Sequence, residues 1–221
     1  MKYAILDCFS SDYQDIFSLT KGSKERYCSR FGFDFLVFNF ELKDRTQHWG
    51  RILGMKRYLG EYDYLVYLDT DSLIVNFNLD LKTLIGQFEE NIITGPLPNQ
   101  GHIGTNGFIL KNCRWSFEFL EEWYAQDRFI DTPYHGSPSC GLSDDGGFDM
   151  PPEKWLFYEQ SAFHFLYDTR PDVRKNTVLI KRSYMHSVPK TFRKGDFLVH
   201  FPGRGKESKI KLIKTYLTKM V

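Results

Sequence analysis

The sequence predicts an α/β fold with a mainly parallel central sheet flanked by helices. Short apolar runs of strand length alternate with longer segments whose apolar residues recur at helical spacing. This alternation is typical of strand–helix–strand units, which place their strands in parallel. The chain has 221 residues and no visible internal repeat or domain boundary, so we expect one domain over residues 1–221.

The first half of the chain predicts three strands and two helices. In order, they are a strand at residues 3–6, a helix at 20–31, a strand at 34–40, a helix at 49–59 and a strand at 64–68. Gly32 follows the first helix, where a glycine often ends a helix in the left-handed conformation. The run at 64–68 (YLVYL) is the clearest buried strand, and it leads directly into Asp69-Thr70-Asp71.

The second half continues the alternation around one long loop. We expect strands at residues 92–94, 107–110, 178–180 and 197–200, and helices at 115–124, 155–167 and 206–221. The last helix is basic and amphipathic. Residues 127–152 are crowded with Gly, Pro, Ser and Asp, and a loop of that length inside a compact domain is usually functional or mobile.

Composition argues against several classes of protein. Charged residues make up 26% of the chain but leave a net charge of +1, whereas a general nucleic-acid binder carries a basic excess. The 4 cysteines form no CxxC pair, which argues against a zinc site or a disulfide framework and favours a reducing compartment. We find no signal peptide and no run of roughly 20 apolar residues that could span a bilayer. We therefore expect a soluble, cytoplasmic protein, whose oligomeric state the sequence leaves open.

Two carboxylates stand one residue apart where the 64–68 strand ends. Along an extended strand, Asp69 and Asp71 would point to the same side. Oxygen ligands of this kind suit Mg²⁺ or Mn²⁺, which keep open positions for phosphate oxygens. Ligands of α/β proteins also bind at the carboxyl ends of strands. The alternative is a simple turn or a helix cap, since DxD is a frequent tripeptide.

A second set of candidate residues lies near the end of the chain. His200 closes the 197–200 run, and neutral imidazole is a good ligand for Mn²⁺. The turn that follows contains Gly203, and glycines there allow backbone amides to approach phosphate closely. Lys206 then supplies a mobile cation for a leaving diphosphate, with Arg204 as a second candidate.

The order of these segments resembles that of GT-A fold glycosyltransferases. The segments are HWGRILGMKRYL, YDYLVYLDTDSLI, GTNGFILKN, YEQSAF and DFLVHFPGRGK. The chain is particularly similar to the retaining family of yeast α-galactosyltransferases, mannan polymerase subunits and plant xyloglucan xylosyltransferases. Those eukaryotic members carry a membrane anchor and lumenal disulfides. The present sequence shows neither feature, so we expect it to be more similar to the soluble transferase domains of bacteria or large algal viruses. Among these are chlorella-virus enzymes that glycosylate the capsid, which would act in the host cytoplasm.

The resemblance implies a Rossmann-like GT-A domain that transfers a sugar from a nucleotide-sugar to a glycan or glycoprotein. It implies Mn²⁺ or Mg²⁺ as cofactor, UDP-sugars as the favoured donors, GDP-mannose as the main alternative, and retention. Asp69, Asp71 and His200 match the family's metal ligands, and Lys206 matches its diphosphate-contacting lysine. The remaining donor-contacting positions are Asp7, Cys8, Phe9 and Ser10 (nucleobase and ribose), Arg51, Thr70, Asn106, Gly107 and Gly203. Arg51 stands where the family usually has Lys, so its role stays open.

The catalytic residues depend on the stereochemistry. A retaining route needs Gln160 or Glu159 on the far face of the sugar, or attack from the leaving-group side. An inverting route needs a carboxylate base beside the acceptor, and Asp144 or Asp145 in the 127–152 loop could serve. We expect that loop to be flexible and to lie on the acceptor side. The residues alone leave both routes open.

Two rival functions remain at this stage. A nucleotidyltransferase or metal-dependent phosphohydrolase also uses paired carboxylates, although it usually needs further carboxylates for a second metal. The other rival is a catalytically inactive module that binds nucleotide-sugars. The remaining histidines lack partners at ligand spacing and are predicted to be surface or core residues: His102, His135, His164 and His186.

Overall fold

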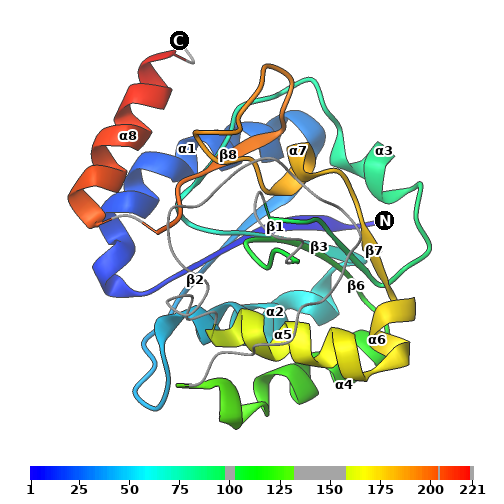
Figure 1. Ribbon diagram of the computed structural model, residues 1–221. Coiled ribbons are helices and arrows are strands. Elements are labelled where there is room, and N and C mark those ends of the chain that lie inside the picture. The colour runs from blue at the N-terminus through cyan, green and yellow to red at the C-terminus, as the bar shows by residue number, and fades with distance from the viewer. Residues whose placement is uncertain (98–102, 132–157, 204, 220–221) are drawn as a thin grey trace.

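The computed structural model describes residues 1–97, 103–131, 158–203 and 205–219 (Figure 1). The central sheet has the strand order β2-β1-β3-β6-β5-β7, and β4 and β8 form a second sheet. The strands are β1 (Tyr3–Phe9), β2 (Asp34–Asn39), β3 (Tyr64–Leu68), β4 (Ser72–Ile74), β5 (Ile92–Thr94), β6 (Gly107–Lys111), β7 (Thr177–Leu179) and β8 (Leu198–His200).

The central sheet is mainly parallel. β1 pairs in parallel with both β2 and β3, and β5 pairs in parallel with β7. β6 is the exception, because it runs antiparallel to β3 and to β5. The expected α/β fold, with a mainly parallel sheet flanked by helices, is confirmed.

Helices cover both faces of this sheet (Figure 1). On one face lie α2, α4 and α5, and on the other lie α1, α3 and α7. The helices are α1 (Gln14–Phe31), α2 (Gly50–Tyr58), α3 (Leu81–Ile85), α4 (Arg114–Tyr124), α5 (Tyr158–Thr169), α6 (Pro171–Lys175), α7 (Arg182–Met185) and α8 (Lys206–Lys219). Short 3₁₀ turns are η1 (Ser11–Tyr13), η2 (Gln47–Trp49), η3 (Leu59–Glu61) and η4 (Asp127–Phe129).

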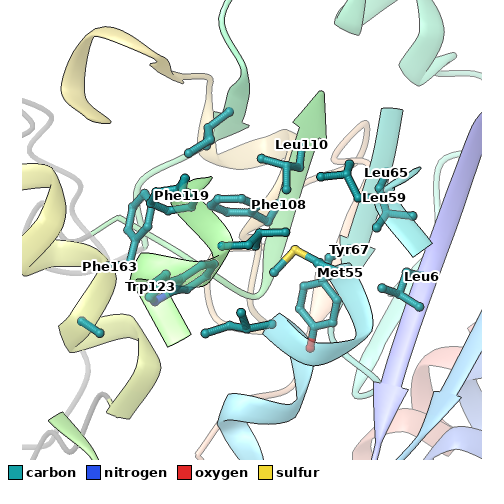
Figure 2. Close-up of a cluster of buried hydrophobic side chains, with 14 of the residues drawn as sticks. Leu6, Met55, Leu59, Leu65, Tyr67, Phe108, Leu110, Phe119, Trp123 and Phe163 are labelled. Atoms are coloured by element: carbon teal, nitrogen blue, oxygen red, sulfur yellow. The ribbon is translucent and has the colours of Figure 1, made fainter. Parts of the chain in front are cut away.

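Alternating side chains of the strands divide the core into two layers. Leu65 and Tyr67 of β3 pack under α2 and α4, whereas Val66 and Leu68 pack on the side of α1 and α3. This follows from the two-residue period of a strand, with both faces of the sheet buried. Figure 2 shows the first layer, in which Trp123 and Phe163 from α4 and α5 meet Phe108 of β6.

The small sheet places the C-terminal segment beside α1. β4 pairs with β8, and their Leu73 and Val199 pack with Ile16 of α1 and Ile213 of α8. This third apolar cluster holds α8 against the N-terminal part of α1. None of the helices in the described part of the chain has the length and hydropathy of a membrane-spanning segment.

Two of the predicted boundaries were wrong in an informative way. The strand expected at residues 3–6 continues to Phe9 as β1, so Asp7 lies inside a strand. α1 begins at Gln14 rather than at Thr20. Its buried face includes the polar residues Thr20 and Lys24, which lowers the apolar contrast that pattern analysis depends on.

Candidate metal and donor site

The Asp69-Thr70-Asp71 segment is a tight turn between β3 and β4. The N–H of Asp69 donates to the carbonyl of Asn106 at 2.9 Å, and the N–H of Ser72 donates to the carbonyl of Asp69 at 3.1 Å. The two aspartates lie in this turn rather than along an extended strand, and their carboxylates still lie on one side, as expected. The turn joins β3 of the central sheet to β4 of the small sheet.

The pairing of β4 with β8 brings His200 to this turn. In the antiparallel register, Ser72 lies opposite His200. His200 Nε2 lies 3.3 Å from Asp69 Oδ2 and 3.1 Å from Asp71 Oδ1. One ligand atom from each residue lies within 4.8 Å of the others. The structure thus brings together the three residues that the resemblance identified as metal ligands.

This donor set fits a divalent ion of the Mn²⁺ or Mg²⁺ type. Two carboxylates supply hard oxygen ligands, and an imidazole is tolerated well by Mn²⁺. Asp71 and His200 are buried, whereas the side chain of Asp69 is 15% exposed. Asp69 is therefore the member of the cluster with the most contact with solvent.

The charged groups of the cluster shift one another's pKa values. Burial alone would raise the pKa of Asp71, but His200 and Lys209 outweigh it and hold the pKa well below its usual value. Burial would also raise the pKa of Asp69, which Arg51 and His200 lower instead. Burial would lower the pKa of His200, but the carboxylates of Asp71 and Asp69 outweigh this effect and raise the pKa to about 9. At neutral pH both carboxylates are charged and the imidazole is protonated.

Arg51 in α2 pairs with Asp69, the more exposed of the two carboxylates. Its Nη2 lies 3.1 Å from Asp69 Oδ1, and its Nη1 lies 3.2 Å from Glu159 Oε1. Nη1 also donates to the carbonyl of Thr105 at 3.0 Å, and the guanidinium stacks on Tyr67 with 5.1 Å to the ring centroid. Arg51 therefore connects Asp69 to Glu159 at the start of α5.

A buried ion pair supports the turn from behind. Lys24 Nζ donates to Asp7 Oδ2 at 2.6 Å, and both side chains are fully buried. Lys24 Nζ also donates to the carbonyl of Asp69 at 2.9 Å, and the hydroxyl of Thr70 donates to Asp7 Oδ1. The structure thus places Asp7 and Thr70 behind the turn that carries the candidate metal ligands, with Asp7 closed off from solvent.

His200 is oriented by a contact with Asn106. Asn106 Nδ2 lies 3.0 Å from His200 Nδ1, and Asn106 Oδ1 lies 2.8 Å from His186 Nδ1. These contacts turn the other ring nitrogen of His200 toward the carboxylates. Asn106 thereby orients His200, and His186, one of the histidines expected to be surface or core residues, is buried and holds Asn106. Burial, followed by the nearby His200, lowers the pKa of His186 to about 3.

The remaining predicted residues surround this cluster at different depths. Cys8, Phe9 and Ser10 are buried near the end of β1. Gly107 packs so closely on Met185 that an added Cβ would lie 2.9 Å from it. Gly203 is exposed and has φ 62, as a left-handed turn residue requires.

The residues expected near the reacting groups do not all lie at the cluster. Lys206 is exposed and pairs with Asp15 Oδ2 at 3.0 Å, rather than with the cluster. Gln160 is partly buried and donates to the carbonyl of Ile103 at 3.1 Å. Asp144, Asp145 and most of the expected 127–152 loop lie outside the described residues, as do His102, His135 and Arg204.

Two lysines at the site were not predicted from the sequence. Lys24 lies on the same face of α1 as Ile16, Thr20 and Tyr27, and Lys209 precedes the buried Ile213 of α8 by one helical turn. A lysine on the apolar face of a helix is unusual, because buried ammonium groups need a partner. That positional signal was present in the sequence and could have identified both residues.

Comparison with known proteins places the chain in a family. The model of the galactosyl transferase GMA12/MNN10 family matches residues 88–211, which is more than half of the chain. The chain belongs to this family. The matched region contains His200 and Lys206 and begins after the Asp69-Thr70-Asp71 turn. Family membership and fold together support glycosyl transfer as the activity.

Solved structures agree on the fold. A glycosyltransferase involved in the glycosylation of the major capsid of PBCV-1 is similar with a TM-score of 0.71 and 16% identity, over 97% of this chain and 100% of that one. The galactosyltransferase LgtC, in complex with donor and acceptor sugar analogs, matches with a TM-score of 0.58 and 11% identity, over 99% and 100% of the two chains. These structural similarities show a shared GT-A fold. A comparison with curated protein sequences gave no match.

Proposed function

We propose that the protein is a metal-dependent, retaining glycosyltransferase that uses a nucleoside diphosphate sugar as donor, with a UDP-sugar favoured over GDP-mannose. The observation that carries the proposal is the convergence of Asp69, Asp71 and His200 at the carboxyl end of β3. Two of these residues lie early in the chain and one lies near its end, yet their ligand atoms lie within 4.8 Å of one another. The acceptor is a glycan or a glycoprotein.

The chemistry needs negative charge to be stabilised on the departing diphosphate. A divalent ion held by Asp69, Asp71 and His200 would act as a Lewis acid there. The protein's own part is to keep both carboxylates ionised and fixed in place. Arg51 and Lys24 do this through Asp69 and the turn backbone, so the site is organised before the donor arrives.

We assign contact with the donor sugar to Gln160 rather than to Glu159. Gln160, at the start of α5, is partly exposed. Glu159 is only 3% exposed and accepts from Arg51 and Thr105. Glu159 is therefore a positioning residue for Arg51. Retention is supported by the family, whereas an inverting base at Asp145 lies outside the described residues.

A panel of nucleotide-sugars tests this function. We expect Mn²⁺-dependent release of the nucleoside diphosphate from one donor, with the sugar transferred to an acceptor or, slowly, to water. Each reaction is run with MnCl₂ and with EDTA, and the products are separated by chromatography. Release of inorganic phosphate or pyrophosphate would instead identify a phosphohydrolase or a nucleotidyltransferase. Donor binding without turnover would identify an inactive binding module.

Metal affinity should rise with pH through His200. An imidazole with a pKa raised to about 9 is protonated at pH 7 and must lose its proton before it can ligate an ion. The pKa values of both aspartates are lowered, so they release no proton in this range. We expect Mn²⁺ affinity to increase about tenfold per pH unit between pH 7 and 9, with one proton released per ion bound.

Calorimetry in buffers with different ionisation enthalpies measures that proton directly. His200→Asn is the matched control, because asparagine keeps a ligand atom without a titrating ring, and its Mn²⁺ affinity should vary little with pH. A wild-type affinity that stays flat from pH 7 to 9 would contradict the assignment of His200 as a ligand.

A further inference from the structure

Lys209 is a buried cation at the metal cluster. It lies in the first turn of α8, and its side chain is only 5% exposed. Its Nζ donates to Asp71 Oδ2 and, at 3.3 Å, to the hydroxyl of Tyr13. The ammonium also lies 5.1 Å from the centroid of the Tyr13 ring. A lysine buried this deeply depends on these partners, because its charge is costly to remove from water.

Asp71 serves two positive groups at once. Its Oδ1 faces His200 Nε2 at 3.1 Å, and its Oδ2 faces Lys209 Nζ. A divalent ion ligated by Asp71 would share this carboxylate with the ammonium of Lys209. Two cations on one carboxylate repel each other, and the repulsion is strong in a buried site. Lys209 therefore opposes metal binding unless a further anion is present.

A donor diphosphate is such an anion, and the first turn of α8 is suited to it. Lys206 and Lys209 are three residues apart in α8, so they lie on neighbouring positions of one helix face. The helix begins directly after the turn at Gly203 and Gly205. Its N-terminal N–H groups favour negative charge, in addition to the two ammonium groups.

We propose that Lys209 is a second diphosphate-binding cation, which competes with the metal ion for Asp71 until the diphosphate binds. This inference rests on the proposed function and deepens it. It makes donor and metal binding cooperative: the diphosphate draws Lys209 away from Asp71, and Asp71 then becomes a better metal ligand. It also connects the packing of α8 to occupation of the donor site.

The substitution Lys209→Met should change the affinities for Mn²⁺ and for UDP in opposite directions. Methionine keeps the apolar stem and removes the charge. Mn²⁺ alone should bind about tenfold more tightly, and UDP in the presence of saturating Mn²⁺ should bind about tenfold more weakly, because a hydrogen bond to a charged group contributes roughly this factor. Both affinities are measured by isothermal titration calorimetry on the full chain, with GDP replacing UDP if GDP is the nucleotide that binds.

Two matched lysines serve as controls. Lys214→Met changes an exposed lysine of the same helix and should leave both affinities at the wild-type value. Lys206→Met should weaken UDP binding without strengthening Mn²⁺ binding, because Lys206 pairs with Asp15 and not with Asp71. Lys209→Gln repeats the experiment if the methionine variant has a lowered melting temperature.

The outcomes separate this inference from the proposed function. If Lys209→Met weakens both ligands, or changes neither, Lys209 only anchors α8 and the proposal is overturned. If the wild-type protein binds neither Mn²⁺ nor a nucleoside diphosphate, the proposed function itself fails.

Discussion

Asp71→Asn should lower the rate of glycosyl transfer by about 10²–10³-fold, the range seen when one preorganised electrostatic contact to a transition state is removed. Asparagine keeps the volume and one oxygen, but it loses the charge that holds the ion. Asp71 also faces His200 and Lys209, so the change removes the shared anion of two buried cationic groups. The measurement is the initial rate of sugar transfer at saturating donor and Mn²⁺.

The loss of rate must be separated from a loss of fold. The assays are run well below the melting temperature of each variant, which circular dichroism records. Asp44→Asn is the matched control, because that carboxylate is 63% exposed and pairs with Arg45, away from the metal cluster and from the 127–152 loop. Exposed ion pairs contribute little to stability, so this variant should keep the wild-type fold. Its rate of sugar transfer should therefore equal that of the wild type. A wild-type rate in Asp71→Asn would refute the metal site.

Lys24→Met should have the largest effect on stability. Lys24 and Asp7 are both fully buried and lie 2.6 Å apart, so removal of the lysine leaves a carboxylate without compensation in the core. Breaking a buried pair in this way costs about 3–5 kcal/mol in free energy of unfolding. The same substitution removes the hydrogen bond to the carbonyl of Asp69, so Mn²⁺ affinity should fall as well.

Urea unfolding at pH 7 measures this change. Lys21→Met, at an exposed position of the same helix, should stay within about 0.5 kcal/mol of the wild type. The double variant Asp7→Asn/Lys24→Met should be more stable than Lys24→Met alone, because no unpaired charge remains in the core. Equal stability of Lys24→Met and the wild type would show that the pair contributes nothing to the fold.

The apolar runs of the sequence predict the strands well where both faces of the sheet are buried. The runs at residues 64–68 and 92–94 were predicted with the bounds that the structure has for β3 and β5. Such strands are apolar throughout, and their ends coincide with the ends of the apolar run. The antiparallel direction of β6 could not be predicted, because strand direction depends on the path of the connecting chain and leaves no mark in a five-residue strand.

The sequence by itself determined the α/β class, the alternation of elements and the residue types of the candidate metal ligands. Asp69, Asp71 and His200 were identifiable because carboxylates and imidazole carry recognisable chemistry at the ends of apolar runs. Only the tertiary structure decided their partners. The antiparallel register of β4 and β8 sets His200 beside the turn, and the packing of α1 and α8 brings Lys24 and Lys209 to it. Contacts between segments far apart in the sequence depend on how the whole chain packs. No local pattern of residues encodes which of these segments will meet.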